Sequence, residues 1–88
     1  MINENKKYNH DKKFPAIIDG HKTYACKHIN GEWIVGGDRV IPKQQVCIAT
    51  RTKKTDNRLA WFTLKGNRLV FSDFVGSEKD EQELIASI

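Results

Sequence analysis

Two cysteines and three histidines are the residues of this 88-residue chain with the widest range of chemistry. Cys26 and His28 stand two positions apart, so both side chains would lie on one face of a strand. His21 and Cys47 could complete a set of four zinc ligands. Structural zinc sites usually take their ligands from two closely and regularly spaced pairs, and these residues lack that spacing. We therefore expect no metal and no other cofactor.

Catalysis by a nucleophile would need an activated thiolate or hydroxyl beside a base. No family signature surrounds either cysteine, and the run Gly36-Gly37-Asp38 lacks the lysine and the helix start of a phosphate-binding loop. Most acidic residues that could do acid-base work fall in predicted turns, where Asp is common for conformational reasons. We therefore expect a non-enzymatic protein, with a hydrolase or nuclease as the enzymatic alternative. The thiols are expected to be free, and a single disulfide is the alternative.

Aromatic residues interleaved with basic ones are the remaining constellation. Such a surface can stack on bases and neutralise phosphates, as small barrels that bind single strands do. A domain of this size needs most of its aromatic rings for its core. Tyr24 and Trp33, on either side of the Asn30-Gly31 turn, are the better candidates for exposure. The aromatic residues that we assign to packing are Trp61, Phe62, Phe71 and Phe74.

The elements that must position these residues are strands. Ile and Val number 14 against four Leu, a β-branched composition suited to a pleated sheet. Asp19-Gly20 and Asn30-Gly31 are typical of tight hairpin turns, and turn residues divide the sequence into roughly six or seven short strands. The run 39–41 precedes Pro42, which favours a sheet edge. We predict a mainly β fold with one short C-terminal helix, in which an antiparallel meander forms a small barrel or a strongly curved sheet.

The C-terminal segment has a helical period instead. Ser77 and Asp80 have the spacing of a capping box, with Asp in place of the usual Glu or Gln. The pattern predicts a helix over about residues 77–87, too short to be stable in isolation. We therefore expect it to dock on the sheet face that bears Trp61 or Phe62.

Length and composition limit the class of protein. A chain of 88 residues with 39% apolar and 30% charged residues is typical of one small globular domain. No apolar run approaches the roughly 20 residues of a spanning helix, and nothing resembles a secretory signal, so we expect a cytoplasmic protein that does not bind membranes. Residues 1–13 contain too few apolar side chains to become ordered. We predict a mobile basic arm at 1–13 and a single β-rich domain at 14–88.

Charge divides unevenly along the chain. Residues 1–68 carry 14 Lys or Arg against six acidic residues, whereas residues 69–88 carry one Lys against five acidic residues. The basic part would attract a polyanion. The leading hypothesis is a small basic binding module that contacts nucleic acid with little sequence specificity. Its candidate binding residues, for nucleic acid or another partner, are Lys22, Tyr24, Lys27, Trp33, Arg51, Lys53, Lys54, Arg58 and Arg68.

The alternative hypothesis is a protein-binding regulator or inhibitor, of the small kind that mobile elements encode. Its basic face would pair with an acidic surface of a partner protein, or its acidic C-terminal helix would occupy a cationic groove. An exposed edge strand such as 39–41 could also pair with a strand of a partner or form a homodimer with a second copy of the chain.

Overall fold

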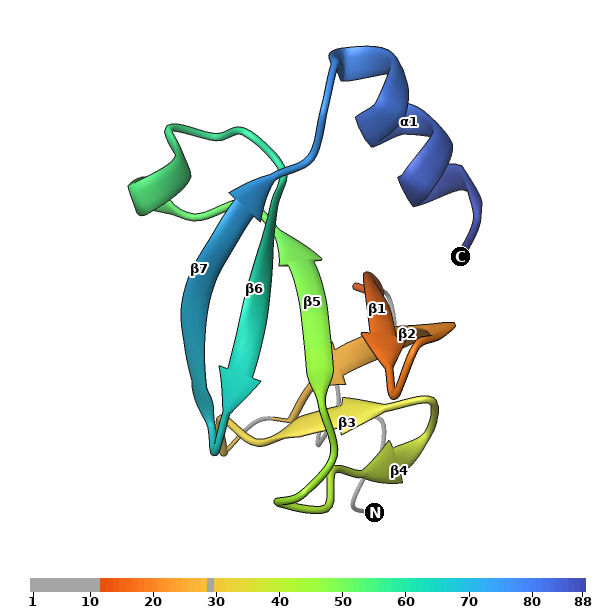
Figure 1. Cartoon of the computed structure of the whole chain (residues 1–88), viewed down its shortest axis with the longest axis vertical. Helices are drawn as coiled ribbons and strands as arrows, with labels where there is room; N and C mark the ends of the chain where they lie inside the picture. Colours follow the sequence, from red (N-terminus) through yellow and green to blue (C-terminus); the bar gives the residue numbers. More distant parts are fainter. Residues whose placement is uncertain (1–11, 29) are drawn as a thin grey trace, which may run out of the picture.

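The structure, a computed structural model, describes residues 12–28 and 30–88, so that nearly all of the predicted basic arm at 1–13 lies outside the described residues. Within this part, seven antiparallel strands form one sheet and a single α-helix follows them (Figure 1). The bounds are β1 Phe14–Ile18, β2 His21–Lys27, β3 Trp33–Val35, β4 Asp38–Arg39, β5 Val46–Thr50, β6 Ala60–Lys65, β7 Arg68–Phe74 and α1 Glu78–Ala86, with a 3-10 turn, η2, at Lys53–Thr55.

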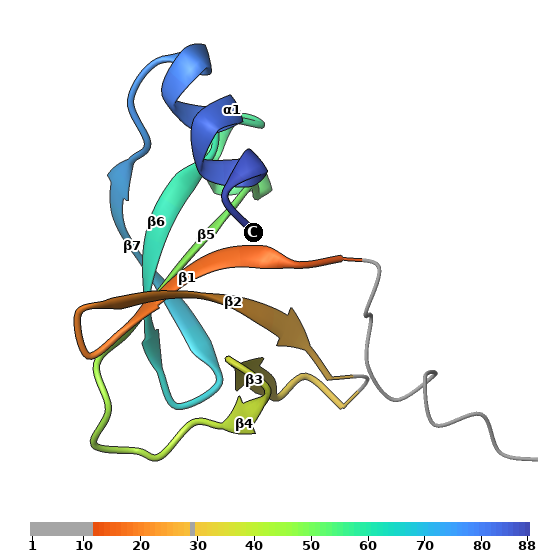
Figure 2. The ribbon, with the colours of Figure 1, turned by 90° about the vertical axis from the view of Figure 1, so that its right-hand side faces the viewer.

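The strand order across the sheet is β4-β3-β2-β1-β5-β6-β7. This confirms the predicted mainly β class with an antiparallel sheet. The sheet is strongly curved but does not close into a barrel through its described strands (Figure 2). Its curvature brings β3 and the β6–β7 turn to one cavity of about 320 Å³, which Trp33 and Gly66 both line. The topology differs from a simple meander at one connection: β5 follows β4 in the sequence but pairs with β1.

The first hairpin turn has the conformation that its sequence predicts. Asp19 and Gly20 both have positive φ, 48° and 84°, and Ile18 pairs with His21 across the turn. The turn also holds the start of β5, because the Asp19 N–H donates to the Gln45 carbonyl at 2.9 Å and the Gln45 N–H donates to the Asp19 carboxylate at 3.2 Å. These two bonds help to place β5 beside β1.

One face of the sheet forms the core. The register places Ala16, Ile48, Phe62 and Phe71 in a row across β1, β5, β6 and β7, and the first three are at most 2% exposed. We call this face the core face. The buried cluster on it consists of Ala16, Ala25, Trp33, Val35, Val46, Ile48 and Leu64.

The opposite face, which we call the helix face, carries α1. Leu84 of the helix packs with Trp61 against a buried cluster that includes Ala49. The predicted capping box is present, since the Ser77 hydroxyl accepts from the Asp80 N–H at 3.3 Å and the Asp80 carboxylate accepts from the Ser77 N–H at 2.9 Å. The predictions of the helix and of its docking beside Trp61 are therefore confirmed.

Candidate functional site

Strand β7 lies at the edge of the sheet and has an irregularity that determines where its aromatic rings point. Phe71 pairs with Phe62, whereas Asp73 pairs with Trp61, so Ser72 is an extra residue opposite that step of β6. In a regular strand, residues three apart point to opposite faces. The bulge at Ser72 instead places Phe71 and Phe74 on the same, core face.

The two rings are in contact and largely uncovered. Their centroids are 5.0 Å apart in an edge-to-face arrangement, and Phe71 also contacts the buried Phe62 at 5.9 Å. Phe71 is 44% exposed and Phe74 is 36% exposed, because among the described residues no strand covers β7 on its outer side. An aromatic row therefore runs from the core to the surface. The sequence-based assignment of Phe71 and Phe74 to the core is wrong in this respect.

Arg58, from the loop between β5 and β6, covers one side of this aromatic row. Its guanidinium carbon lies 4.0 Å from the centroid of the Phe74 ring, within the range of a cation–π contact. The described residues include no acidic side chain within salt-bridge distance of Arg58, so the contact with Phe74 leaves its guanidinium donors available to a ligand.

The β5–β6 loop is held in shape by Thr55, which is 1% exposed. The Thr55 hydroxyl donates to the Thr52 carbonyl at 2.9 Å and accepts from the Thr52 N–H at 3.0 Å. The chain then turns through positive φ at Asp56 and Asn57, and the Arg58 N–H donates to the Thr55 carbonyl at 2.9 Å. A small internal network thus fixes the loop and presents its side chains outward.

Two further cations project from the same loop. Lys53 and Lys54 belong to the η2 turn and are both exposed. We call the group of exposed cations and rings on the loop and on β7 the edge cluster. Its members are Lys53, Lys54, Arg58, Phe71 and Phe74.

No protein-family model matches the chain, and no curated protein or solved structure is significantly similar to it.

Trp33, one of the two aromatic candidates for exposure, is buried instead. The Trp33 side chain is 6% exposed and packs edge-to-face on Phe14, with ring centroids 5.6 Å apart. Lys27 lies over the Trp33 ring at 5.7 Å. Tyr24 is half-buried, and the Lys13 ammonium lies 4.8 Å from the centroid of its ring. Neither ring offers an open platform for a base.

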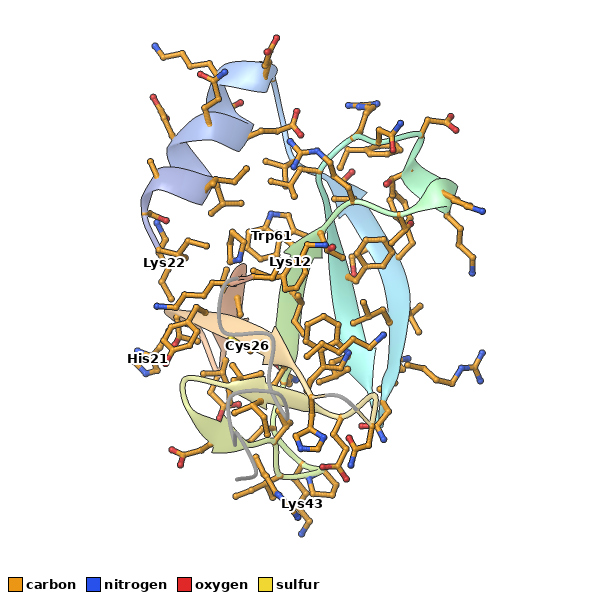
Figure 3. The ribbon with its side chains drawn as sticks, turned by 180° about the vertical axis from the view of Figure 1, so that it is seen from behind. Lys12, His21, Lys22, Cys26, Lys43 and Trp61 are labelled. Atoms are coloured by element: carbon orange, nitrogen blue, oxygen red, sulfur yellow. The ribbon has the colours of Figure 1, made fainter. Side chains whose placement is uncertain are left out.

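The other predicted binding residues are spread over the molecule. Lys22 lines a small cavity beside α1 with Trp61, far along the surface from Lys43 (Figure 3). Arg51 is paired with Glu81 of α1 at 3.2 Å, and the same carboxylate accepts from the Leu59 N–H at 2.8 Å. Arg68 is exposed at the turn end of β7. Of the nine predicted residues, the structure therefore gathers Lys53, Lys54 and Arg58 in the edge cluster.

The described residues show no group of three or more His, Cys, Asp or Glu side chains that could hold a metal ion. Cys26 and Cys47 are free, the first buried and the second half-buried. Burial raises the pKa of the Cys26 thiol above its ordinary value, and the nearby Lys13 ammonium offsets part of the rise. A raised pKa disfavours the thiolate that nucleophilic chemistry would need. Within the described part of the chain, no helix is long and apolar enough to span a membrane.

Proposed function

We propose that this protein binds single-stranded nucleic acid through the edge cluster, with little sequence specificity. The observation that carries the proposal is the exposed pair Phe71 and Phe74 with the Arg58 guanidinium stacked 4.0 Å from the Phe74 ring centroid. Exposed aromatic rings beside cations are the combination with which proteins stack on unpaired bases and neutralise their phosphates.

Single strands fit this surface better than a duplex does. In a duplex the base faces are stacked on one another, so the rings of Phe71 and Phe74 would have no base to contact. In a single strand, a base can stack on an open ring while Arg58 and the two lysines of the loop contact the flanking phosphates. Stacking tolerates any base because every base has a π-face, and this accounts for the weak specificity that we propose.

The distribution of charge supports the same placement. The loop between β5 and β6 carries four cations, Arg51, Lys53, Lys54 and Arg58, against Asp56 alone. The acidic helix α1 carries four carboxylates against Lys79 and packs on the helix face, opposite the core face that bears Phe71 and Phe74 (Figure 1). One of these carboxylates, that of Glu81, is bound by Arg51 of the loop. A polyanion would therefore be drawn to Lys53, Lys54 and Arg58 and to the core face of β7, and repelled from the acidic helix face.

The test is the binding of a fluorescently labelled oligothymidylate of about 15 nucleotides, followed by anisotropy at about 50 mM salt. Phe74→Ala is expected to weaken binding by about tenfold, since stacking is worth roughly 1–3 kcal/mol per base. Arg58→Gln should weaken binding, whereas Arg39→Gln, which removes the same charge from β4, is the matched control and should change it little. Binding should also decrease with salt, with a log–log slope of about −2 for three phosphate contacts.

The proposal fails if the oligonucleotide does not bind, if binding has no salt dependence, or if Arg39→Gln weakens it as much as Arg58→Gln. A protein captured stoichiometrically by the chain after nuclease treatment, together with no oligonucleotide binding, would replace it with the regulator hypothesis.

A further inference from the structure

We infer that two copies of this chain pair through β7, antiparallel and about a twofold axis at Val70, to form one continuous sheet. The inference goes beyond the proposed nucleic-acid binding and rests on the backbone and the charges of the free sheet edge. β7 is seven residues long and exposed along nearly its whole length. The other edge strand, β4, has two residues and offers too short a template for pairing.

The direction of the backbone groups of β7 follows from its ladder with β6. The Val75 N–H donates to the Leu59 carbonyl at 2.9 Å, so Val75 and Leu59 are a hydrogen-bonded pair. In the next pair, Ala60 and Phe74, the backbone N–H and C=O groups therefore point away from each other. At the other end, Lys65 and Arg68 close a two-residue turn and so face each other.

The alternation of an antiparallel ladder then determines the residues between these two ends. Val70 faces β6 with its backbone groups, whereas Leu69 and Phe71 direct theirs to the open edge. Beyond the bulge the edge cannot pair with another strand, because the outward Phe74 N–H already donates to the Asp73 carboxylate at 2.8 Å. The segment available for pairing is therefore 68–71.

A twofold axis at Val70 gives every outward backbone N–H and C=O group of this segment a hydrogen-bond partner. Leu69 of one copy lies opposite Phe71 of the second, so each of these pairs can exchange two backbone hydrogen bonds. The two Val70 side chains, each 42% exposed in the single chain, meet at the axis on the helix face. Such a self-complementary contact is the form that a symmetric dimer requires.

Charge complementarity identifies a second copy as the occupant of this edge. Arg68 pairs with Lys65 and Asp73 pairs with Trp61, so both residues lie on the helix face of β7. With the axis at Val70, Arg68 of each copy lies opposite the Ser72–Asp73 bulge of the other, so that its guanidinium comes beside the Asp73 carboxylate. The pairing thus forms two symmetric opposite-charge pairs. Exposed charges usually protect an edge strand from pairing, but here their order along β7 suits an antiparallel copy of itself.

The test is the oligomeric state of the full chain, measured by sedimentation velocity between about 5 and 500 μM, a range that detects dimers with a Kd near 100 μM. We expect a concentration-dependent dimer. Val70→Lys puts two like charges opposite each other at the axis and is expected to raise the dimer Kd by roughly tenfold or more. Ile41→Lys makes the same kind of change at a 59% exposed residue outside the pairing segment and should leave the Kd unchanged.

Exchanging the charges at positions 68 and 73 distinguishes this pairing register from any other contact made by the β7 edge. Arg68→Asp and Asp73→Arg each place like charges opposite each other and should weaken the dimer, whereas the double variant restores both pairs and should regain most of the affinity. The inference is overturned if the wild-type chain stays monomeric over the whole range, if Val70→Lys dimerises as the wild type does, or if the double variant is no better than the single ones. None of these outcomes depends on nucleic acid, so the proposed function is tested separately.

Discussion

Trp33 and Phe74 each lie under a cation, yet one ring is inside the molecule and the other is on its surface. The Lys27 ammonium is 5.7 Å from the Trp33 ring centroid, and the Arg58 guanidinium carbon is 4.0 Å from that of Phe74. Trp33 is 6% exposed and Phe74 is 36% exposed. A cation beside a ring therefore indicates a contact, and only the exposure of the ring distinguishes packing from a surface that can bind a ligand.

The position of each strand in the sheet explains the difference. β3 lies between β2 and β4, and the curvature of the sheet packs Trp33 against Phe14 and the buried cluster. β7 is an edge strand, and its bulge turns Phe74 toward Phe71 rather than toward the helix face. The same residue types thus serve the core in one half of the sheet and remain open to solvent in the other.

The largest effect that this comparison predicts is on stability. Trp33→Ala should lower the free energy of unfolding by about 3–5 kcal/mol, because it removes a large buried ring and leaves a cavity. Phe74→Ala should lower it by only about 1 kcal/mol, because part of that ring is already in water. Urea unfolding followed by far-ultraviolet circular dichroism measures both.

Since a domain this small has little stability to lose, Trp33→Phe serves as a milder second variant. It should fold, be less stable than the wild type and bind the oligonucleotide as the wild type does. Equal losses of stability for Trp33→Ala and Phe74→Ala would show that the two rings are not in different environments.

Arg51 and Arg58 extend the comparison to two cations of one loop. Arg51 is tied to Glu81, whose carboxylate also accepts the Leu59 N–H, whereas Arg58 lies on Phe74. Glu81→Ala removes both bonds that join α1 to the loop and should lower the free energy of unfolding by about 1–3 kcal/mol, since the N–H of the buried Leu59 loses its acceptor.

The paired readout is oligonucleotide affinity. Arg58→Gln should reduce the affinity with little change in stability, whereas Glu81→Ala should reduce the stability and leave the affinity of the folded chain within about twofold. A reversed pattern, with binding lost in Glu81→Ala alone, would place the contact surface at the helix rather than at β7.

Thr55 tests whether the shape of the loop matters to the edge cluster. Its hydroxyl makes two hydrogen bonds with Thr52 inside the loop. Thr55→Val keeps the volume but leaves the Thr52 N–H without an acceptor, while the Thr52 carbonyl keeps only its bond from the Thr55 N–H. The change should lower the stability by about 1–2 kcal/mol and weaken oligonucleotide binding. Thr55→Ser retains the hydroxyl and should bind like the wild type. Unchanged binding in Thr55→Val would mean that the two lysines of η2 can contact the oligonucleotide without the loop shape that Thr55 fixes.

Much of the fold follows from local sequence patterns. The Asp19-Gly20 turn and the capping box at Ser77 were predictable because each depends on residues close together in the chain. The placement of β5 beside β1 was not, because it depends on contacts such as that between Asp19 and Gln45, 26 positions apart.

The candidate site was predictable only in part. Lys53 and Lys54 were identified as a basic pair in a polar loop, and Arg58 as a basic residue beside an aromatic-bearing strand. The aromatic half was not identified, since Phe71 and Phe74 were assigned to packing, and their exposure depends on which strand lies at the sheet edge and on the bulge at Ser72. The three-residue spacing of Phe71 and Phe74 predicts opposite faces, and nothing in the residue types of β7 signals the extra residue.

The smallest predicted effect concerns the half of the sheet that buries Trp33, where Cys26 of β2 pairs with Ile34 of β3. Burial raises the pKa of the Cys26 thiol from its ordinary value of 9.0, and the Lys13 ammonium lowers it in part. Because the folded pKa is the higher one, the thiol's contribution to stability is complete below the unfolded pKa and is lost as the pH rises through the folded pKa.

The free energy of unfolding of the wild type should therefore decrease more steeply than that of Cys26→Ala as the pH rises above the ordinary thiol pKa of 9.0. Cys47→Ala, which keeps the buried thiol, is the matched control and should retain the wild-type slope. If the three proteins lose stability in parallel, the Cys26 thiol is as well solvated in the folded chain as in the unfolded one. Water would then reach this part of the β2–β3 pairing more readily than the 5% exposure of Cys26 indicates.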